Sequence, residues 1–244
     1  MHTVPEYDSP SIMADYSEQI QRIKLKLRAA KRKDRAFNVF GSKSHKYRLS
    51  KPASRKTIER IENTYRISLP DCYKTFVSQI GNGGRPSFNA GAGPYYGIFP
   101  LGEEIDFIVS DPENHLSKPC ILSPDLSDEY WDDLTRSVLN FDDMSDEEYD
   151  LAAGNIYAGI LPIVSQGCTY LNGLVVTGPY KGRVVNLDFE FGKPSFAFEE
   201  NFLDWYERWL DEVILGALDK SPSWFGFQKR TCDHIPIDSP LLQH

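Results

Sequence analysis

The sequence predicts an α+β protein: a mostly antiparallel sheet flanked by helices, with a basic helical extension at the N-terminus. Three observations predict this class. In several segments the apolar residues recur every three or four positions, which is the period of an amphipathic helix. Between residues 159 and 198, runs rich in Val, Ile, Leu and Phe are separated by Gly-containing turns. No segment long enough for a crossover helix separates these runs, which argues against a parallel sheet.

The composition fits one globular domain with extensions. Of the 244 residues, 41% are hydrophobic and 25% are charged, as in ordinary proteins with a packed core. We expect a tail and basic helix over residues 1–50, the main domain over 51–226 and a surface tail over 227–244. No apolar run approaches the ~18 residues that span a bilayer, and the first residues do not resemble a secretory signal. The cysteines are too sparse for a disulfide framework, so we expect a cytoplasmic protein without membrane association.

The first predicted helix, over residues 12–33, is strongly basic. Its apolar stripe runs through Ile12, Tyr16, Ile20, Ile23 and Leu27. Residues 15–60 hold 15 Lys and Arg against 4 Asp and Glu, whereas residues 61–244 hold 12 against 29. Either the basic arm packs against the acidic body, or each surface meets a different partner. We favour packing within the chain, because the stripe is narrow and poor in Trp and Phe, and we expect no direct binding of nucleic acid.

Two further helices precede a glycine-rich segment. Ser54 is the predicted N-cap of one, and Pro70 the predicted first residue of the next. Gly81 stands where a left-handed residue ends a helix. The glycines at 91, 93 and 97 match neither a P-loop nor a dinucleotide fingerprint, so we interpret residues 80–102 as a joint between helix and sheet. Tyr95 and Tyr96 either cover the edge of the core or face a partner, and we favour the first. "GIFPLG" and "PCILSP" are predicted to be short strands.

The strands of the sheet are "GILPIVS", "CTYLNGLVVTG", "GRVVNLDFEF" and "PSFAF". "GPYKG" between the second and third is typical of a hairpin, which predicts antiparallel pairing. A final helix starts at the predicted N-cap Asn201 and has a wide apolar face containing Trp205 and Trp209. Its acidic residues are expected to face solvent: Asp204, Glu207, Asp211 and Glu212.

Searches for catalytic chemistry find no supporting motif. There is no GxSxG nucleophile elbow or HExxH zinc motif, and the five histidines are scattered. Cys168 is interpreted as a small buried strand residue. The tract "DDMSDEEYD" lacks the Gly and Glu that an EF-hand loop requires. We therefore predict no catalytic residue, no cofactor and no metal site.

Residues 125–150 are the most acidic part of the chain, with eleven carboxylates against the single Arg136. Aromatic residues among carboxylates are the composition of a surface that binds a basic protein partner. A solvated acidic loop is the alternative. The predicted contact residues are Tyr130, Trp131, Asp132, Asp133, Asp142, Asp143, Asp146, Glu147 and Glu148.

The segments "LPDCYKTFVSQIGNGG" and "GPYYGIFPLG" resemble the N-terminal signature of the SUKH superfamily, and the later strands with "FLDWYERWL" are similar to its core. The resemblance covers roughly residues 55–215. The signature positions, which we expect to be structural, are Leu69, Pro70, Tyr73, Phe76, Gly81, Asn82, Gly83, Gly84, Gly97 and Pro100.

The superfamily includes fungal cell-wall-assembly regulators and bacterial immunity proteins against polymorphic toxins. The resemblance implies an α+β fold without catalytic residues and a function in binding other proteins. We therefore expect an immunity protein that binds and neutralises a cognate toxin, a basic nuclease-like domain being one candidate. The alternatives are a regulatory scaffold that docks through the basic helix and, less favoured, an enzyme whose site forms only in the fold. The sequence leaves open whether the chain forms a homodimer.

Overall fold

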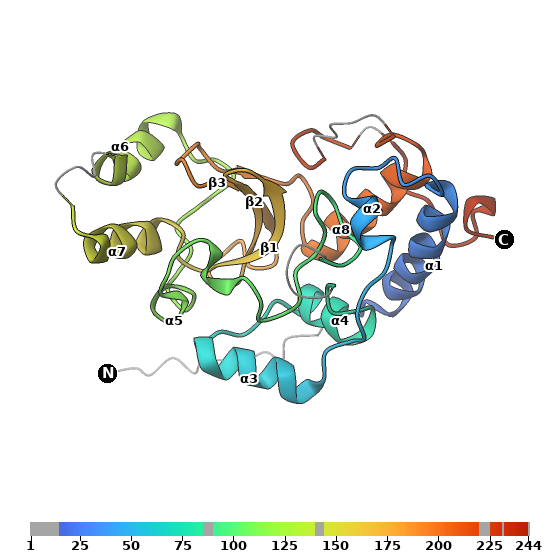
Figure 1. The fold of residues 1–244 in the computed structure, drawn as a ribbon, viewed down its shortest axis with the longest axis horizontal. Helices are drawn as coiled ribbons and strands as arrows, with labels where there is room; N and C mark the ends of the chain where they lie inside the picture. The colour runs from blue at the N-terminus through green and yellow to red at the C-terminus, as the bar shows by residue number, and fades with distance from the viewer. Residues whose placement is uncertain (1–14, 85–89, 140–143, 220–224, 231, 244) are drawn as a thin grey trace, which may run out of the picture.

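The computed structural model describes residues 15–84, 90–139, 144–219, 225–230 and 232–243. Within these residues, eight α-helices surround one four-stranded sheet, so the α+β class is confirmed (Figure 1). The helices are α1 (Ser17–Lys33), α2 (Ser42–His45), α3 (Arg55–Tyr65), α4 (Asp71–Gln79), α5 (Pro112–His115), α6 (Asp128–Leu139), α7 (Asp146–Ile156) and α8 (Phe202–Ile214). The strands are β1 (Ile160–Gly167), β2 (Tyr170–Val175), β3 (Val184–Asp188) and β4 (Ser195–Phe196), and short 3₁₀ turns lie at Ile105–Phe107 and Pro240–Leu242.

The sheet is antiparallel throughout and follows chain order, β1-β2-β3-β4. "GPYKG" connects β2 to β3, as predicted. The two extra strands that we expected do not form. In "GIFPLG" only Ile98 makes isolated bridges, to Gly91 and Val164, and Pro100 has no N–H with which to extend the ladder. "PCILSP" is held instead by a side chain, since the Cys120 N–H donates to Thr177 Oγ1 at 3.0 Å.

The central strands are buried on both faces because alternate residues point into two separate cores. Leu174 and Val184 belong to the larger core, together with residues of α1, α3, α4 and α8. Val175 and Val185, one position along, belong to the smaller core beneath α6 and α7. Figure 1 shows the sheet between these two groups of helices, with α6 and α7 at one end of the molecule and α1 and α8 at the other.

The helix ends follow local sequence signals only in part. Ser54 and Asn201 are N-caps as predicted, and the Asn201 side chain accepts from two backbone N–H groups. Pro70 is the N-cap of α4 rather than its first residue. Gly81 is not left-handed; instead a Cβ there would lie 2.5 Å from Leu49 Cβ, so close packing requires the glycine.

The glycine-rich segment is architectural in its described part, because its backbone makes close approaches that exclude side chains. Gly97 has φ +94°, and a Cβ there would lie 2.2 Å from the Gly91 carbonyl oxygen. The Leu101 N–H donates to Asn82 Oδ1 at 2.8 Å, which ties the start of the segment to its end. Tyr95 is buried and donates to the Phe225 carbonyl, whereas Tyr96 is exposed, so only the first covers the core.

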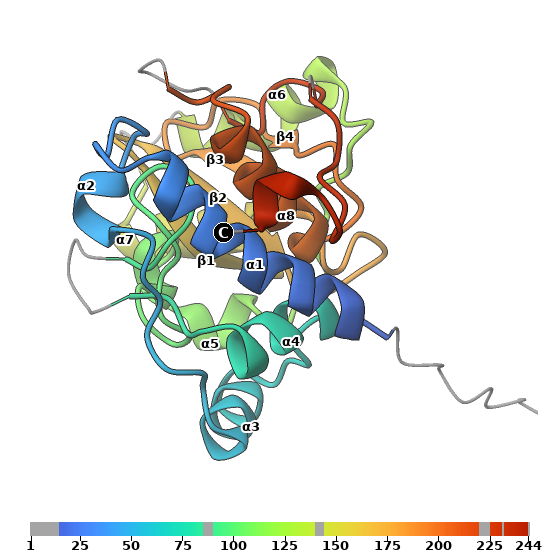
Figure 2. The ribbon, with the colours of Figure 1, turned by 90° about the vertical axis from the view of Figure 1, so that its right-hand side faces the viewer.

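The basic helix α1 lies across α8 (Figure 2), so packing of the basic arm on the acidic body is confirmed. Lys26 is 0% exposed, and its Nζ lies 2.6 Å from Asp211 Oδ1 and 2.9 Å from Glu207 Oε1. Arg22 Nε also pairs with Glu207, at 2.8 Å. The expectation that Glu207, Asp211 and Glu212 face solvent was therefore wrong, since all three are buried.

Segments outside residues 51–226 contribute to the same larger core. From the N-terminal side, Ile23, Val39 and Tyr47 are buried in it. From the C-terminal side, Ile235 and Leu242 are buried in it, and the 3₁₀ turn that contains Leu242 contacts α1. Both segments therefore contribute side chains to this core, although most of the described residues from 227 onward are exposed.

Candidate protein-interaction surface

Helix α6 is held on its inner side by Trp131, which reaches the connection between β3 and β4. This side chain is only 3% exposed, and its Nε1–H donates to the Phe191 carbonyl at 2.8 Å. Val138, on the same helix, is also buried in the smaller core. Trp131 was expected to contact a partner. The structure contradicts that role, because the ring is buried and anchors the helix.

Helix α7 begins with a capping box. The Ser145 side chain accepts from the Glu148 N–H, and the Glu148 carboxylate accepts from the Ser145 N–H at 2.9 Å. Backbone and side-chain hydrogen bonds from Ser145 lower the pKa of Glu148. Ala153 and Ile156 bury the other end of the helix in the smaller core. Glu148 thus has a structural task as well as an exposed position.

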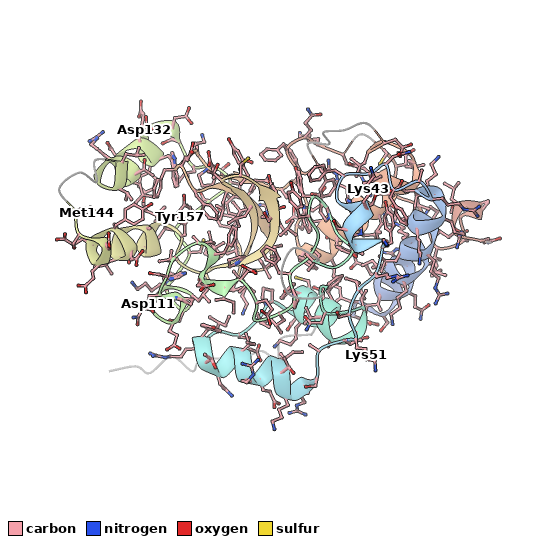
Figure 3. All side chains as sticks on the ribbon, viewed as in Figure 1. Lys43, Lys51, Asp111, Asp132, Met144 and Tyr157 are labelled. Carbon is pink, nitrogen blue, oxygen red and sulfur yellow. The ribbon has the colours of Figure 1, made fainter. Side chains whose placement is uncertain are left out.

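The outward side of α6 and α7, here called the acidic surface, carries the remaining predicted residues. Tyr130 is 51% exposed, and Leu151, on α7, is 60% exposed. Figure 3 shows Asp132 on α6 at the same end of the molecule as Met144, which precedes α7. Asp142 and Asp143 lie outside the described residues. The exposed carboxylates of the acidic surface are Asp128, Glu129, Asp132, Asp133, Asp146, Glu147 and Glu148.

Among the residues that the structure describes, two of these carboxylates have cationic partners: Asp128 pairs with Lys193, and Asp133 with Arg136. Such exposed pairs contribute little to stability, with a median of about 0–1 kcal/mol. The acidic surface therefore keeps most of its charge available to an external partner.

A cavity of about 460 Å³ opens beside the acidic surface, between α5 and α7. Asp111 and His115 line it from α5 and the residue before it, and Glu147, Asp150 and Leu151 line it from α7. The sequence shows only that the histidines are scattered, and it gives no indication that His115 lines a cavity. No spacing rule would have found it, because the two walls come from segments more than thirty residues apart in the chain.

His45 is buried in the protein, whereas Cys168 is exposed at its surface. Burial lowers the pKa of His45 to about 4, so this histidine is neutral in the core. Cys168 was expected in a buried strand, but it is exposed in the turn between β1 and β2, with φ +50°. Over the described ranges, no three His, Cys, Asp or Glu side chains are placed to hold a metal ion. Nor is any helix in this part of the chain both long and apolar enough to cross a membrane.

The signature positions build the fold rather than an exposed site. Tyr73 and Phe76 pack edge-on against Phe202 of α8, with ring centroids 4.9 and 5.1 Å apart. Leu69 and Pro70 are buried beside them, and Gly81, Gly83 and Gly97 are buried in the joint that follows. Asn82, Gly84 and Pro100 are partly buried.

These features define an α+β domain in which signature residues form the core and two acidic helices form an outer surface. The chain matches the SMI1 / KNR4 family (SUKH-1) over residues 52–208, and it belongs to that family. The family includes immunity proteins and cell-wall regulators, and its members typically bind protein partners. A search of curated proteins finds no match to the chain.

Proposed function

We propose that the chain is a non-catalytic binding module of the immunity type, which neutralises a cognate toxin by occupying its surface through the acidic surface on α6 and α7. The observation that carries this proposal is the combination of exposed carboxylates with exposed apolar side chains on helices anchored to a sheet. Family membership supports a protein partner.

The physical argument favours a basic partner. A surface of one sign raises the association rate by steering the encounter, by about 10- to 1,000-fold at low salt. Tyr130 and Leu151 would supply the desolvated contacts that slow dissociation, since aromatic residues are enriched among binding hot spots. Trp131 supports this from beneath, because it fixes α6 to the connection between β3 and β4, and a helix that is already ordered binds without the entropic cost of becoming ordered.

The test is a charge reversal with a matched control. The acidic-surface variant carries Asp132→Lys, Asp146→Lys and Glu147→Lys; it leaves Glu148 in place because that residue caps α7. The control variant reverses exposed carboxylates elsewhere on the chain and changes the net charge by the same amount: Glu103→Lys, Glu200→Lys and Asp238→Lys.

The partner is first captured with the wild-type chain and then expressed as a toxin in a host strain. We expect the wild type and the control variant to restore growth, and the acidic-surface variant to fail. At low salt the acidic-surface variant should bind the captured toxin at least about 10-fold more slowly than the control. Equal association rates and equal protection would refute the acidic surface as the contact. Failure of the wild type to protect would refute the immunity role.

A regulatory scaffold is the second candidate, and one observation favours it. Lys24, Arg28 and Lys31 form an exposed stripe on α1, on the side away from α8. Deleting residues 1–50 would not test this stripe cleanly, because it would also remove Ile23 and Tyr47 from the core. Reversing the three exposed basic residues to Glu leaves the core intact, and loss of a captured partner in that variant alone would support the scaffold.

A further inference from the structure

We propose that the cavity between α5 and α7 binds an arginine side chain of the partner. This inference rests on the proposed function, because it names the side chain of the partner that enters the cavity beside the acidic surface. The cavity of about 460 Å³ shares Glu147 with that surface, and Leu151 lies at its mouth. Its lining offers acceptors of hydrogen bonds from two walls, and the described part of the chain does not supply donors for all of them.

His115 is the group that most clearly lacks a partner. The residue is 2% exposed, and its Nδ1 lies 2.7 Å from the Asp111 carbonyl oxygen. A carbonyl oxygen only accepts, so Nδ1 carries the proton and donates it. Burial lowers the pKa of His115, which keeps the ring neutral and leaves Nε2 as a bare acceptor. This Nε2 is buried without a hydrogen-bond partner among the described residues, which is costly unless a donor reaches it.

The carboxylates around the cavity also favour a ligand that donates hydrogen bonds. Asp111 accepts from Asn114 Nδ2, and Asp150 accepts from Ser110 Oγ. Each carboxylate has about four lone-pair sites, so both keep capacity for further donors. Lys118, the cation of the lining, donates to Asn155 Oδ1 at 2.9 Å. Asp111, Glu147 and Asp150 outnumber it, so the cavity is negatively charged.

A guanidinium group matches this set of hydrogen-bond acceptors. It has five donors and no acceptor, so it can serve two carboxylates without introducing an unpaired acceptor, and it serves the buried His115 Nε2 once the ring moves enough to expose that atom to the cavity. It is also more weakly hydrated than an ammonium group and is favoured in ion pairs at interfaces. Val109 and Leu151 provide apolar contact for the aliphatic part of the side chain. Gly154 keeps the wall open, since a Cβ there would lie 3.5 Å from both His115 Cβ and Val109 Cγ1.

The experiment uses the full chain and a small probe, and so does not depend on a protein partner. The probe is Nα-acetyl-arginine amide, and the control is Nα-acetyl-citrulline amide, which has nearly the same shape but no charge. NMR of the His115 imidazole nitrogens follows the titration. We expect a saturable shift of His115 Nε2 with the arginine probe, at a Kd on the order of 1–10 mM, and no saturable shift with the citrulline probe.

Variants decide whether the cavity carboxylates are responsible. Glu147→Gln and Asp150→Asn should each weaken binding of the probe about 5-fold or more, whereas Asp132→Asn, on α6, should leave it within about 2-fold. A His115 resonance that does not move, or equal shifts with the two probes, would overturn the proposal. Tighter binding of Nα-acetyl-lysine amide would overturn the choice of arginine.

The outcomes also separate this inference from the proposed function. If the chain neutralises a toxin through its acidic surface while the probe fails to bind, only the arginine site is refuted. If the probe binds and the chain protects no host, the proposed function fails and the site stands as a cation pocket.

Discussion

Replacing Lys26 with Met tests the buried link between α1 and α8. The ammonium group is fully buried, 2.6 Å from Asp211 and 2.9 Å from Glu207. The methionine keeps most of the side-chain volume but removes the charge, which leaves two buried carboxylates with one cation fewer. Arg22 still pairs with Glu207 and Arg230 with Asp211, so each carboxylate keeps one cationic partner.

The expected loss of unfolding free energy follows from the burial of the Lys26 ion pairs. Removing one partner from a buried ion pair costs about 3–5 kcal/mol, because the remaining charge stays in a medium of low polarity. The two arginines place Lys26→Met near the lower end, at about 3 kcal/mol of unfolding free energy. For a chain of this size that corresponds to a melting temperature roughly 6–12 °C lower.

The assay is equilibrium unfolding in guanidinium chloride at pH 7, followed by tryptophan fluorescence, which reports Trp205 and Trp209 on α8. Lys24→Met, two residues earlier on the exposed side of α1, is the control, with an expected loss below about 0.5 kcal/mol. Arg22→Met should fall between the two, since Arg22 is only partly buried. If Lys26→Met loses no more than Lys24→Met, the inference that the α1–α8 ion cluster holds the two helices together is refuted.

Four other substitutions have defined outcomes. Trp131→Ala should lower the unfolding free energy by about 3–5 kcal/mol, because it opens a cavity beneath α6; a loss below about 1 kcal/mol in chemical denaturation would contradict its anchoring role. Burial holds the pKa of His45 at about 4 against its ordinary 6.5, so the unfolded chain gains its proton first as pH falls. The contribution of this histidine to the unfolding free energy is fully present above pH 6.5 and falls by about 3 kcal/mol between pH 6.5 and 4. His45→Gln should remove this pH dependence of the unfolding free energy, measured in a series of denaturation curves. Gly97→Ala should destabilise the chain through positive φ and a backbone clash, whereas Gly154→Ala, within α7, should stabilise it by about 0.5–1 kcal/mol in thermal unfolding.

Short-range sequence signals correctly predicted the strands of the sheet and the N-caps of two helices. The strands of the sheet follow from β-branched runs with Gly-containing turns, and the caps at Ser54 and Asn201 follow from hydrogen bonds that reach only two or three residues. The strand expected at "GIFPLG" failed because a strand also needs a neighbour along its whole length, and the structure supplies only single bridges there.

The candidate site was less predictable, because its properties depend on contacts between distant segments. Helical period correctly grouped the apolar residues of α8, but it assigned Glu207 and Asp211 to solvent. Their cationic partner, Lys26, lies more than 180 residues earlier in the chain. Trp131 was predicted from composition to meet a partner, and only the position of Phe191 shows that its indole faces inward. The cavity at His115 depends in the same way on α5 and α7 meeting.

The two charged regions of the chain are used in different ways, and this separates stability from binding. On α1, the basic charges that face α8 are matched by buried carboxylates, so they contribute to the fold and are removed from the surface. On α6 and α7, the carboxylates face solvent on the opposite side of the sheet, and most of their charge stays unmatched within the described chain. Substitutions in the first region should therefore change the unfolding free energy without changing the association rate of the folded protein. Substitutions in the acidic surface should do the reverse, because an exposed charge contributes little to folding but acts on a partner at a distance.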